Sequence, residues 1–315
     1  MLTIRNLSHD PFYNQAFEEY IYQTFPDDDI FFLWQNSPAV VVGSYQNICR
    51  EVHVEALRRL GIPVVRRMTG GGTVYHDLGN VNYTYIVRTD GGWNYDDVLA
   101  PVIAALNAIG VPARKNRVCD IAIGDLKISG SAQRIVKGRL LHHGTLLFSS
   151  DLSVLDQITT HRKNDCFQSR GTQSAICTVT NIREHLASPM TIEEFQDRLL
   201  EQMVPPGSPH LTLTAEQEAE VCRLRDAKYC SWEWTWGRTP AFTYEKSGIF
   251  NGVPIRVAYQ AKRGIVSDAV IDCAAIDGAL AAQLLSGSRL DPEGFAAICY
   301  RLAGDGAGEL MDWLM

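Results

Sequence analysis

Three consecutive glycines at positions 70–72 constrain this chain more than any other feature of its sequence. Adjacent glycines lose much backbone entropy on folding and have no side chain to pack, so they suit a place where a ligand lies against the main chain. Backbone N–H groups at such a place can bind phosphate or carboxylate oxygens. The glycines follow an apolar strand-like run, 62–65, and precede another, 81–87. A flexible hairpin connection is the alternative, but Arg66-Arg67 before the glycines and His76-Asp77 after them favour an anion-binding loop.

Composition limits the class of protein. The chain has 315 residues, of which 46% are hydrophobic and 21% charged, as in a globular protein with one large domain and a small one, or two of similar size. The net charge is −7 without a block of lysines and arginines, which argues against nucleic acid as a partner. No signal peptide is visible, and no apolar run approaches the ~20 residues that a membrane span needs. We therefore expect a cytoplasmic protein with no membrane partner.

The cysteines indicate neither a disulfide framework nor a metal centre. The sequence has 8 cysteines, none in a Cys-x-x-Cys pair and none with a histidine at zinc-ligand spacing. We expect them to be reduced thiols, mostly serving as small packing residues. No fixed metal site formed by the protein is predicted.

Local signals predict a mixture of helices and strands. Asp10 and Pro11 should open a helix, because aspartate caps a helix and proline fits its first turn. Another helix over 54–60 should end at Gly61. Apolar and β-branched runs predict strands at 31–34, 39–43, 81–87 and 142–148, while amphipathic spacing predicts a helix from Asp96 or Asp97 to 109.

Later segments add a hairpin and further helices. Gly124-Asp125 joins two short apolar runs, 121–123 and 126–128, as in a two-residue hairpin. Capping boxes begin at Thr191 and Thr214. After about residue 242 the pattern predicts strand, strand, helix and helix at 253–258, 265–271, 274–285 and 293–302. Strands and helices without regular alternation indicate an α+β fold with mixed or mostly antiparallel sheets. The stretch 205–209 is either a linker or a surface loop.

A lysine follows the hairpin turn. Side chains alternate along a strand, so Lys127 should point away from the face that carries Leu126 and Ile128. If those two residues pack inward, the lysine becomes a fixed cation on the other face. A solvent-facing lysine is the alternative, but the small residues at 129–132 permit close approach of a ligand. His142 and His143 on the next strand should face opposite sides, so at most one would reach such a ligand.

A glycine loop and a lysine suit one kind of chemistry. They can hold the α-phosphate of ATP while a carboxylate attacks it, giving an acyl-adenylate and pyrophosphate. Catalysis is then mainly positioning and electrostatic stabilisation. The loop is not a Walker loop, because the Gly-Lys-Ser/Thr ending is missing. Neither a nucleophile elbow nor a protein-kinase motif set is present.

These motifs resemble those of the lipoate–protein ligase A family, which belongs with the lipoyltransferases and biotin–lipoate protein ligases. The resemblance covers nearly the whole chain in order, and its main motifs are Arg66-Arg67-x-x-Gly70-Gly71-Gly72-x-Val74-Tyr75-His76-Asp77-Leu78-Gly79-Asn80, Lys127-Ile128-Ser129-Gly130-Ser131-Ala132 and His142-His143-Gly144-Thr145-Leu146-Leu147. Supporting matches lie at 14–19, 33–36, 46–47, 179–182, 231–237 and 239–242.

The resemblance implies a fold and a reaction. It implies a catalytic domain at 1–245 of the class II aminoacyl-tRNA synthetase and biotin–protein ligase type, then a small α+β accessory domain at 246–315. The stretch 205–209 then becomes an internal loop. It also implies that (R)-lipoate, ATP and Mg²⁺ give lipoyl-AMP. The lipoyl group then passes to a lysine of apo lipoyl domains, in 2-oxoacid dehydrogenase E2 subunits and the glycine cleavage H protein.

The resemblance also implies site residues. Lys127 should be catalytic, contacting the acyl carbonyl and the phosphate, and the lipoyl tail should lie against Val74 and Tyr75. Binding of ATP and lipoyl-adenylate is expected at Arg67, Gly70, Gly71, Gly72, Thr73, Val74, Tyr75, His76, Asp120, Lys127, Ser129, Gly130, Ala132, His143 and Thr145. A loop that covers the adenylate should include Gly171, Ser174 and Thr178, and we expect the segment 169–180 to be mobile without ligand.

Two departures from the family pattern keep alternatives open. Cys119 stands where the family usually has asparagine, and residues 173–178 contain few basic side chains. Either change could weaken ATP use or alter the choice between lipoate and octanoate. One alternative is a transferase that takes preformed lipoyl-adenylate. Others are an octanoyl transferase with Cys119 as nucleophile, which needs a nearby cation to lower the thiol pKa, a non-catalytic lipoate-binding protein, and a biotin ligase.

Overall fold

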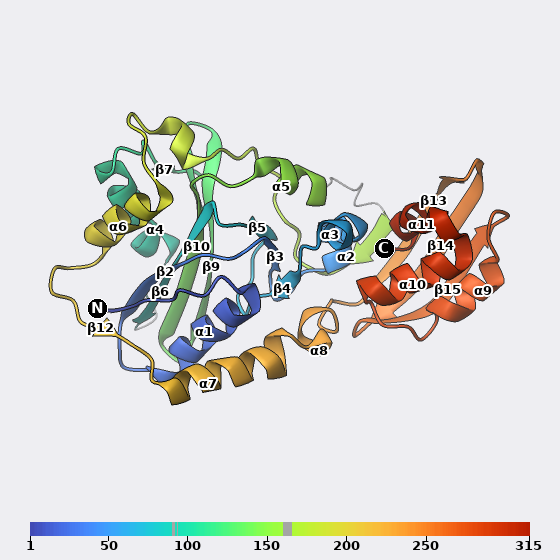
Figure 1. Cartoon of the computed structure of the whole chain (residues 1–315), viewed down its shortest axis with the longest axis horizontal. Coiled ribbons are helices and arrows are strands. Elements are labelled where there is room, and N and C mark those ends of the chain that lie inside the picture. The colour runs from blue at the N-terminus through green and yellow to red at the C-terminus, as the bar shows by residue number, and fades with distance from the viewer. Residues whose placement is uncertain (90–91, 93, 160–165) are drawn as a thin grey trace.

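The computed structural model describes residues 1–89, 92, 94–159 and 166–315. Its largest element is an eight-stranded sheet, which occupies the left half of Figure 1. The strands in spatial order are β12 (His210–Leu211), β1 (Leu2–Ile4), β2 (Ile30–Trp34), β6 (Asn80–Arg88), β10 (Arg139–Leu147), β9 (Leu126–Val136), β8 (Asp120–Ile123) and β7 (Arg114–Lys115). β1 pairs with β12 and β2 in parallel, and the remaining pairs are antiparallel.

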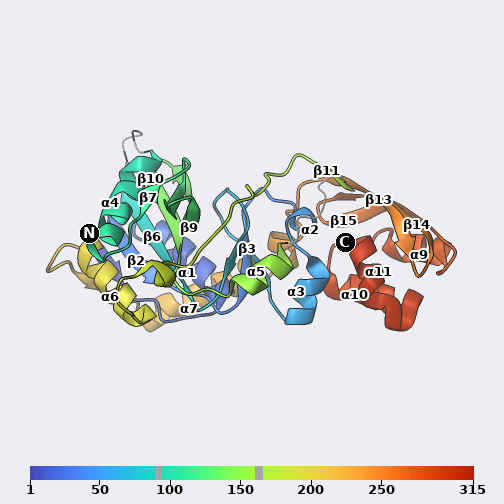
Figure 2. The same cartoon turned by 90° about the horizontal axis from the view of Figure 1, so that it is seen from above.

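Helices cover both faces of this sheet because β2 is apolar on both. Phe31 and Leu33 pack into a core with α4 (Tyr95–Ala108) and α6 (Ile192–Met203). Phe32 and Trp34, which alternate with them, pack into a second core with α1 (Pro11–Thr24) and α7 (Ala215–Leu224). In Figure 1, α1 and α7 lie below the large sheet and α4 and α6 at its upper left, and Figure 2 shows the same half of the molecule from above.

The predicted helix starts agree closely with the structure. Asp10 caps α1, its Oδ1 accepting a 2.9 Å bond from Phe12 N, and both capping boxes are formed at the starts of α6 and α7. α4 begins one or two residues earlier than predicted, because Asn94 and not an aspartate is its cap. Residues 205–209 connect α6 to β12, which is a strand of the large sheet. They are therefore an internal loop and not a linker between domains.

A three-stranded sheet lies between the large sheet and the C-terminal elements (Figure 1). It consists of β4 (Val64–Arg66), β3 (Ala39–Val42) and β5 (Val74–His76). Two short helices, α2 (Ile48–Glu51) and α3 (Val54–Leu60), follow β3, and Gly61 ends α3 in the left-handed conformation with φ 65°. The glycine loop therefore connects β4 to β5, at the side of this sheet that faces β9 and β10.

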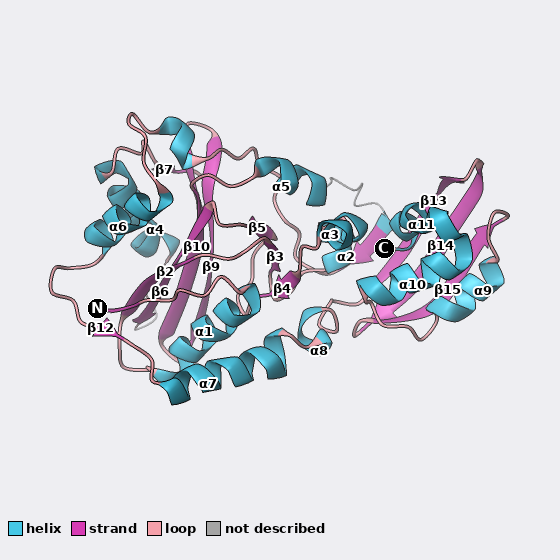
Figure 3. Ribbon diagram, in the orientation of Figure 1, coloured by secondary structure: helices cyan, strands magenta, loops and turns pink. Residues whose placement is uncertain are grey.

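The C-terminal elements form a four-stranded antiparallel sheet with three helices on one face (Figure 3). The strands are β11 (Phe167–Ser169), β13 (Phe242–Phe250), β14 (Val253–Lys262) and β15 (Ile265–Cys273), and the helices are α9 (Gly278–Leu285), α10 (Pro292–Ala303) and α11 (Ala307–Leu314). These elements share one hydrophobic core with α2, α3 and the three-stranded sheet. The division into domains at 245/246 remains a prediction, and β13 runs through that position.

The sequence-based prediction for this region was wrong in three respects. It missed β13, where Glu245, Lys246 and Gly248 interrupt the apolar pattern, and it missed α11, which follows a glycine-rich turn. α9 begins at Gly278, capped by Asp277, and not at 274. The α+β class with mixed, largely antiparallel sheets is confirmed. No helix among the described residues is long and apolar enough to cross a membrane.

Candidate functional site

A cavity of about 320 Å³ lies between the glycine loop, β5, the β8–β9 hairpin, β10 and residues 172–175. Thirteen of the residues predicted to bind the ligand line it, namely Arg67, Gly71, Gly72, Thr73, Val74, His76, Asp120, Lys127, Gly130, Ala132, His143, Thr145 and Ser174. The lining also includes residues that the sequence did not single out for the site, among them Gln15, Trp34, Val41, Asn82, Arg117, Val118 and Gln173.

The glycine loop is held by a close approach between two main chains. A Cβ at Gly43 would lie 2.3 Å from the carbonyl oxygen of Gly71, so a larger residue at 43 would displace the loop. Gly71 itself has φ 85°, a conformation that favours glycine. Ser44 N also donates a 2.8 Å bond to Thr69 O. Glycine is therefore required at 43 by packing and favoured at 71 by the backbone conformation.

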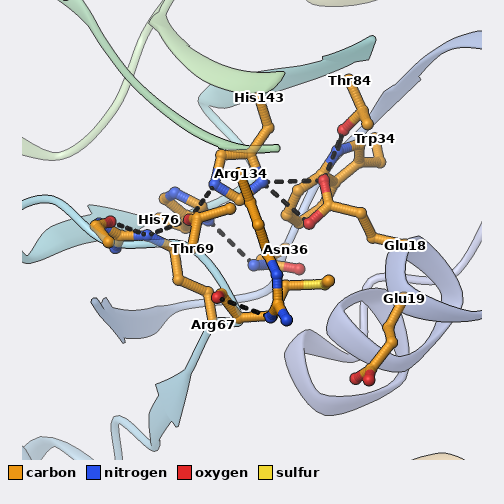
Figure 4. Close-up of polar contacts among 12 residues, drawn as sticks. Glu18, Glu19, Trp34, Asn36, Arg67, Thr69, His76, Thr84, Arg134 and His143 are labelled. Carbon is orange, nitrogen blue, oxygen red and sulfur yellow. Dashed lines mark hydrogen bonds and ion pairs between the residues drawn. The ribbon is translucent and has the colours of Figure 1, made fainter. Parts of the chain in front are cut away.

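Arg67 supports this loop from inside the protein (Figure 4). The side chain is buried, and its Nη2 donates to the carbonyls of Gly70 and Gly72 at 2.6 and 2.7 Å. Its Nε donates to Thr69 Oγ1 at 3.1 Å, and Nη1 donates to Val41 O. Burial lowers the pKa of Arg67 to about 10, which leaves the guanidinium charged at neutral pH. In this structure Arg67 thus shapes the loop through its carbonyls.

Lys127 lies on the cavity wall, as strand alternation predicts. Ile128, the next residue, is fully buried in the core with α4 and α6, whereas the Lys127 side chain lines the cavity. Its Nζ lies 2.9 Å from Oδ1 of the buried Asp120 on the paired strand. A Cβ at Gly130 would lie 2.9 Å from this nitrogen, so glycine leaves room for the ammonium group. The lysine is therefore a fixed cation.

The two adjacent histidines face opposite sides of β10, as predicted. His143 lines the cavity, and its Nδ1 lies 2.9 Å from both carboxylate oxygens of Glu18. His142 is buried on the other face and stacks on Tyr83 with the ring centroids 6.0 Å apart. Burial lowers the pKa of His142 to about 3, so it is neutral in the folded protein.

His76 lies between the cavity and a polar cluster behind it. Its Nδ1 is 2.9 Å from Asn36 Nδ2, and its ring packs edge-on against Trp34. Burial lowers the pKa of His76 to about 3, and the nearby charge of Arg67 acts in the same direction. The neutral ring of His76 thus forms part of the cavity wall.

Five predicted residues do not line the cavity. Tyr75 alternates with Val74 and His76, so its side chain packs into the core beneath the three-stranded sheet. In this structure the Tyr75 side chain therefore points away from the cavity in which the lipoyl tail is expected. Ser129 is fully buried, and the other three are Gly70, Gly171 and Thr178.

The segment expected to cover the adenylate rests on the glycine loop. The Oγ of Ser174 accepts bonds from Thr73 N at 2.8 Å and from Gln46 Nε2 at 3.1 Å, and it donates to Glu51. Thr172 N donates to Tyr45 O at 3.0 Å. Further along, Thr178 O accepts a 2.9 Å bond from Lys127 N. The segment is thus connected both to the loop and to the catalytic candidate.

Residues 10–204 match the family described as lipoyl protein ligase A/B catalytic domain. The chain belongs to this family. It is 35% identical over 268 residues to lipoate–protein ligase 1 of Staphylococcus aureus, covering 83% of this chain and 81% of the relative. It is also 35% identical over 281 residues to lipoate-protein ligase LplJ of Bacillus subtilis, covering 86% and 84%. Like these relatives, this lipoyl protein ligase family member is an enzyme.

Solved structures agree with the fold. Protein Ta0514 of Thermoplasma acidophilum, solved with bound lipoic acid, is 25% identical, with a TM-score of 0.64 over 75% of this chain and 98% of its own. A lipoate-protein ligase A bound with ATP is 25% identical, with a TM-score of 0.63 over 74% and 96%. A structure of the bipartite Thermoplasma acidophilum ligase and its E2 lipoyl domain is 24% identical, with a TM-score of 0.64 over 74% of this chain and 95% of its own. The predicted family and fold type are therefore confirmed.

Cys119, one departure from the usual pattern of this ligase family, lies on the cavity wall. Its Sγ is 3.7 Å from Asp120 Oδ1. Burial raises the pKa of the Cys119 thiol, the charge of Asp120 raises it further, and the opposing effect of Lys127 is smaller. A thiolate nucleophile needs the reverse shift. The environment therefore disfavours the octanoyl-transfer alternative that uses Cys119.

Sequence reasoning missed three residues around the loop of this ligase. Gln46 Oε1 accepts bonds from Gly43 N and from Thr73 Oγ1 at 2.8 and 2.9 Å, and the motif match at 46–47 could have revealed it. Glu51, the partner of Ser174, and Gly43 carry no local signal. Their roles depend on contacts between segments that are far apart in the sequence.

Proposed function

We propose that this enzyme is an ATP-dependent lipoate–protein ligase that activates (R)-lipoate to lipoyl-AMP and then transfers the lipoyl group to a protein lysine. The observation that carries the proposal is the position of Lys127 and the main chain of the glycine loop on one cavity, with apolar walls beside them. Relatives with lipoate–protein ligase activity in their names and structures with lipoic acid or ATP support it.

In the first step, a carboxylate oxygen of lipoate attacks the α-phosphorus of ATP. The bond to the bridging oxygen breaks, and pyrophosphate leaves with its electron pair. Negative charge on the phosphoryl oxygens is stabilised by Lys127, whose ammonium group Asp120 holds in place at 2.9 Å. Because Asp120 is only 6% exposed, water competes little for this ion pair.

The glycine loop supplies neutral donors to the same charge. Thr73 N–H donates to the Ser174 hydroxyl in this structure. A phosphate oxygen is a stronger acceptor than a hydroxyl, so it can replace Ser174 at this donor. Binding of the nucleotide would then release one contact of the covering segment and allow that segment to pack around the adenylate.

In the second step, the acceptor lysine amine attacks the carbonyl carbon of lipoyl-AMP. An amide bond forms, the bond between the carbonyl carbon and the phosphate oxygen breaks, and AMP leaves. The lysine proton passes to solvent. Lys127 next to the phosphate stabilises the departing AMP. The apolar walls that hold the lipoyl tail comprise Trp34, Val41, Val74 and Ala132.

Mg²⁺ accompanies the nucleotide in this proposal. Within the described residues, no three histidine, cysteine, aspartate or glutamate side chains gather closely enough to hold a metal ion. Mg²⁺ would therefore be held mainly through the phosphates of ATP, and it would neutralise part of their negative charge. The proposed acceptors are the apo lipoyl domains of 2-oxoacid dehydrogenase E2 subunits and the glycine cleavage H protein.

The test uses the purified protein with lipoate, MgATP and an apo lipoyl domain. The acceptor mass and pyrophosphate release are followed together. We expect ATP-dependent lipoylation with pyrophosphate released in step. Product from preformed lipoyl-AMP but none from lipoate and ATP would make the protein a transferase and would contradict the first step.

A further inference from the structure

The buried carboxylate of Glu18 lies under the cavity wall and takes no part in the chemistry proposed above (Figure 4). Glu18 is fully buried on α1. Both of its oxygens lie 2.9 Å from Nδ1 of His143, and Thr84 Oγ1 donates a 2.7 Å bond to Oε1. A buried carboxylate is costly unless its oxygens are satisfied, so this set of partners fixes its position.

The other nitrogen of His143 continues the contact toward the glycine loop. His143 Nε2 lies 2.8 Å from Thr69 Oγ1, and Arg67 Nε lies 3.1 Å from the same oxygen. A guanidinium can only donate, so Thr69 accepts from Arg67 and its own proton is free to donate to Nε2. His143 then donates from Nδ1 to Glu18. The hydrogen positions are assigned from these capacities, and every bond in the series is satisfied.

At the far end of the series, Arg67 holds the carbonyls of Gly70 and Gly72 at 2.6 and 2.7 Å. Four side chains thus connect α1, β10 and the loop in the order Glu18, His143, Thr69, Arg67. Although Arg67 is buried, the described hydrogen bonds of its guanidinium go to carbonyls and to a hydroxyl. Burial lowers the pKa of Arg67, and the nearby negative charge of Glu18 opposes this effect.

We propose that Glu18 and Thr69 are positioning residues, which fix the conformation of the glycine loop through His143 and Arg67. The hydrogen-bonded series sets the orientation of the Arg67 guanidinium group. The guanidinium in turn sets the positions of the Gly70 and Gly72 carbonyls. The N–H groups on the other side of those peptide planes are thereby aimed at the cavity. This inference deepens the proposed function and rests on it for its kinetic test, but its structural test does not require activity.

Thr69 offers the sharper substitution. Thr69→Val keeps the shape of the side chain and removes the hydroxyl that joins His143 to Arg67, whereas Thr69→Ser keeps the hydroxyl. We expect Thr69→Val to raise the KM for ATP in lipoate-dependent pyrophosphate release by about tenfold, with a smaller change in kcat. In Thr69→Ser the KM for ATP should stay within about threefold of the wild-type value. In the ligand-free proteins, amide hydrogen exchange at 70–73 should be faster in Thr69→Val and near the wild-type rate in Thr69→Ser.

A second pair of variants tests the carboxylate. Glu18→Gln keeps the size of the side chain and removes its charge. Glu19→Gln is the matched control, because Glu19 follows on the same helix and is also buried, but it bonds Lys228 and Tyr229 at 2.5 Å. Glu18→Gln should raise both the KM for ATP and exchange at 70–73, and Glu19→Gln should change neither.

Several results would overturn the inference. One is amide hydrogen exchange at 70–73 that stays at the wild-type rate in Thr69→Val. Another is that Thr69→Val and Thr69→Ser change the exchange and the KM for ATP equally, and the last is that Glu18→Gln and Glu19→Gln do so. If the wild-type protein released no pyrophosphate, the proposed function would fail. The exchange measurements would then decide the inference alone.

Discussion

Lys127 Nζ and Asp120 Oδ1 lie 2.9 Å apart on neighbouring strands of one hairpin, at the wall of the cavity. Asp120 holds the Lys127 ammonium group at a fixed point of this wall. Removing a charge that stabilises a transition state typically costs about 10²–10³-fold in rate. Lys127→Ala should therefore lower lipoate-dependent pyrophosphate release by at least about 100-fold, with an unchanged circular dichroism spectrum. A folded Lys127→Ala protein with near-normal release would exclude the proposed role of the lysine.

Gly43 tests the packing of the glycine loop. A methyl group at 43 would approach Gly71 O to 2.3 Å, so Gly43→Ala must displace the loop. We expect adenylate formation to fall by about tenfold or more, because small misplacement of binding groups strongly affects catalysis. Gly306→Ala is the control, since its new methyl group would meet only ordinary contacts at 3.6 Å or longer. Wild-type kinetics in Gly43→Ala would show that the loop adapts freely.

Ser174 tests the connection of the covering segment to the loop. Ser174→Ala removes the acceptor for Thr73 N–H and the donor to Glu51. Without ligand, trypsin should cleave after the exposed Arg170 faster in this variant than in the wild type. Lipoate with MgATP should change cleavage at Arg170 in the wild type. Identical cleavage with and without these ligands would argue against the segment as a cover for the adenylate.

Cys119 should be dispensable. Burial and the neighbouring Asp120 raise the pKa of its thiol, so alkylation by iodoacetamide should be slow at neutral pH and accelerate above the ordinary thiol range. Cys119→Ser should retain lipoyl transfer to within about threefold, because no covalent step on this sulfur is required. Rapid labelling of Cys119 at pH 7, measured by peptide mass spectrometry, together with loss of transfer in Cys119→Ser, would restore the thiol mechanism.

His142 should make stability depend on pH. Burial lowers its pKa from 6.5 to about 3, so between these values the unfolded chain binds a proton that the folded protein does not. The contribution of neutral His142 to the free energy of unfolding is therefore complete above pH 6.5. It decreases by about 1.4 kcal/mol per pH unit as the pH falls through this window. Urea unfolding at pH 6 and pH 4.5 should show a smaller pH dependence in His142→Phe than in the wild type. His9→Gln, on the exposed surface, is the control and should keep the wild-type slope.

Much of the secondary structure could be predicted because its signals are local. Asp10 next to Pro11 specifies a helix start, and Gly124-Asp125 specifies a tight turn, each through contacts within a few residues. The alternation along β9 places Lys127 opposite Ile128. The same rule, applied to β5, could have shown that Tyr75 points away from the cavity while Val74 and His76 point into it.

The elements that were missed lack such signals. β13 contains charged residues and a glycine, and it becomes a strand because β14 and β11 pair with its two edges. Arg67, which the sequence predicts as a ligand contact, lines the cavity, and its hydrogen bonds to Gly70 and Gly72 show that it also supports the loop. The sequence indicates the chemistry of a paired arginine beside glycines, but the direction of a long side chain depends on which acceptors surround it.

The sequence by itself determined the class of fold, the glycine loop, the lysine on the hairpin and the family, since motifs and alternation depend on neighbouring residues. Only the tertiary structure decided which distant groups support them. Glu18 reaches His143 across 125 positions, and Ser174 reaches Thr73 across 101. Such pairs form because burial removes water from polar groups and forces each to find a partner in the packed interior. That choice depends on every packed element at once, so no local pattern encodes it.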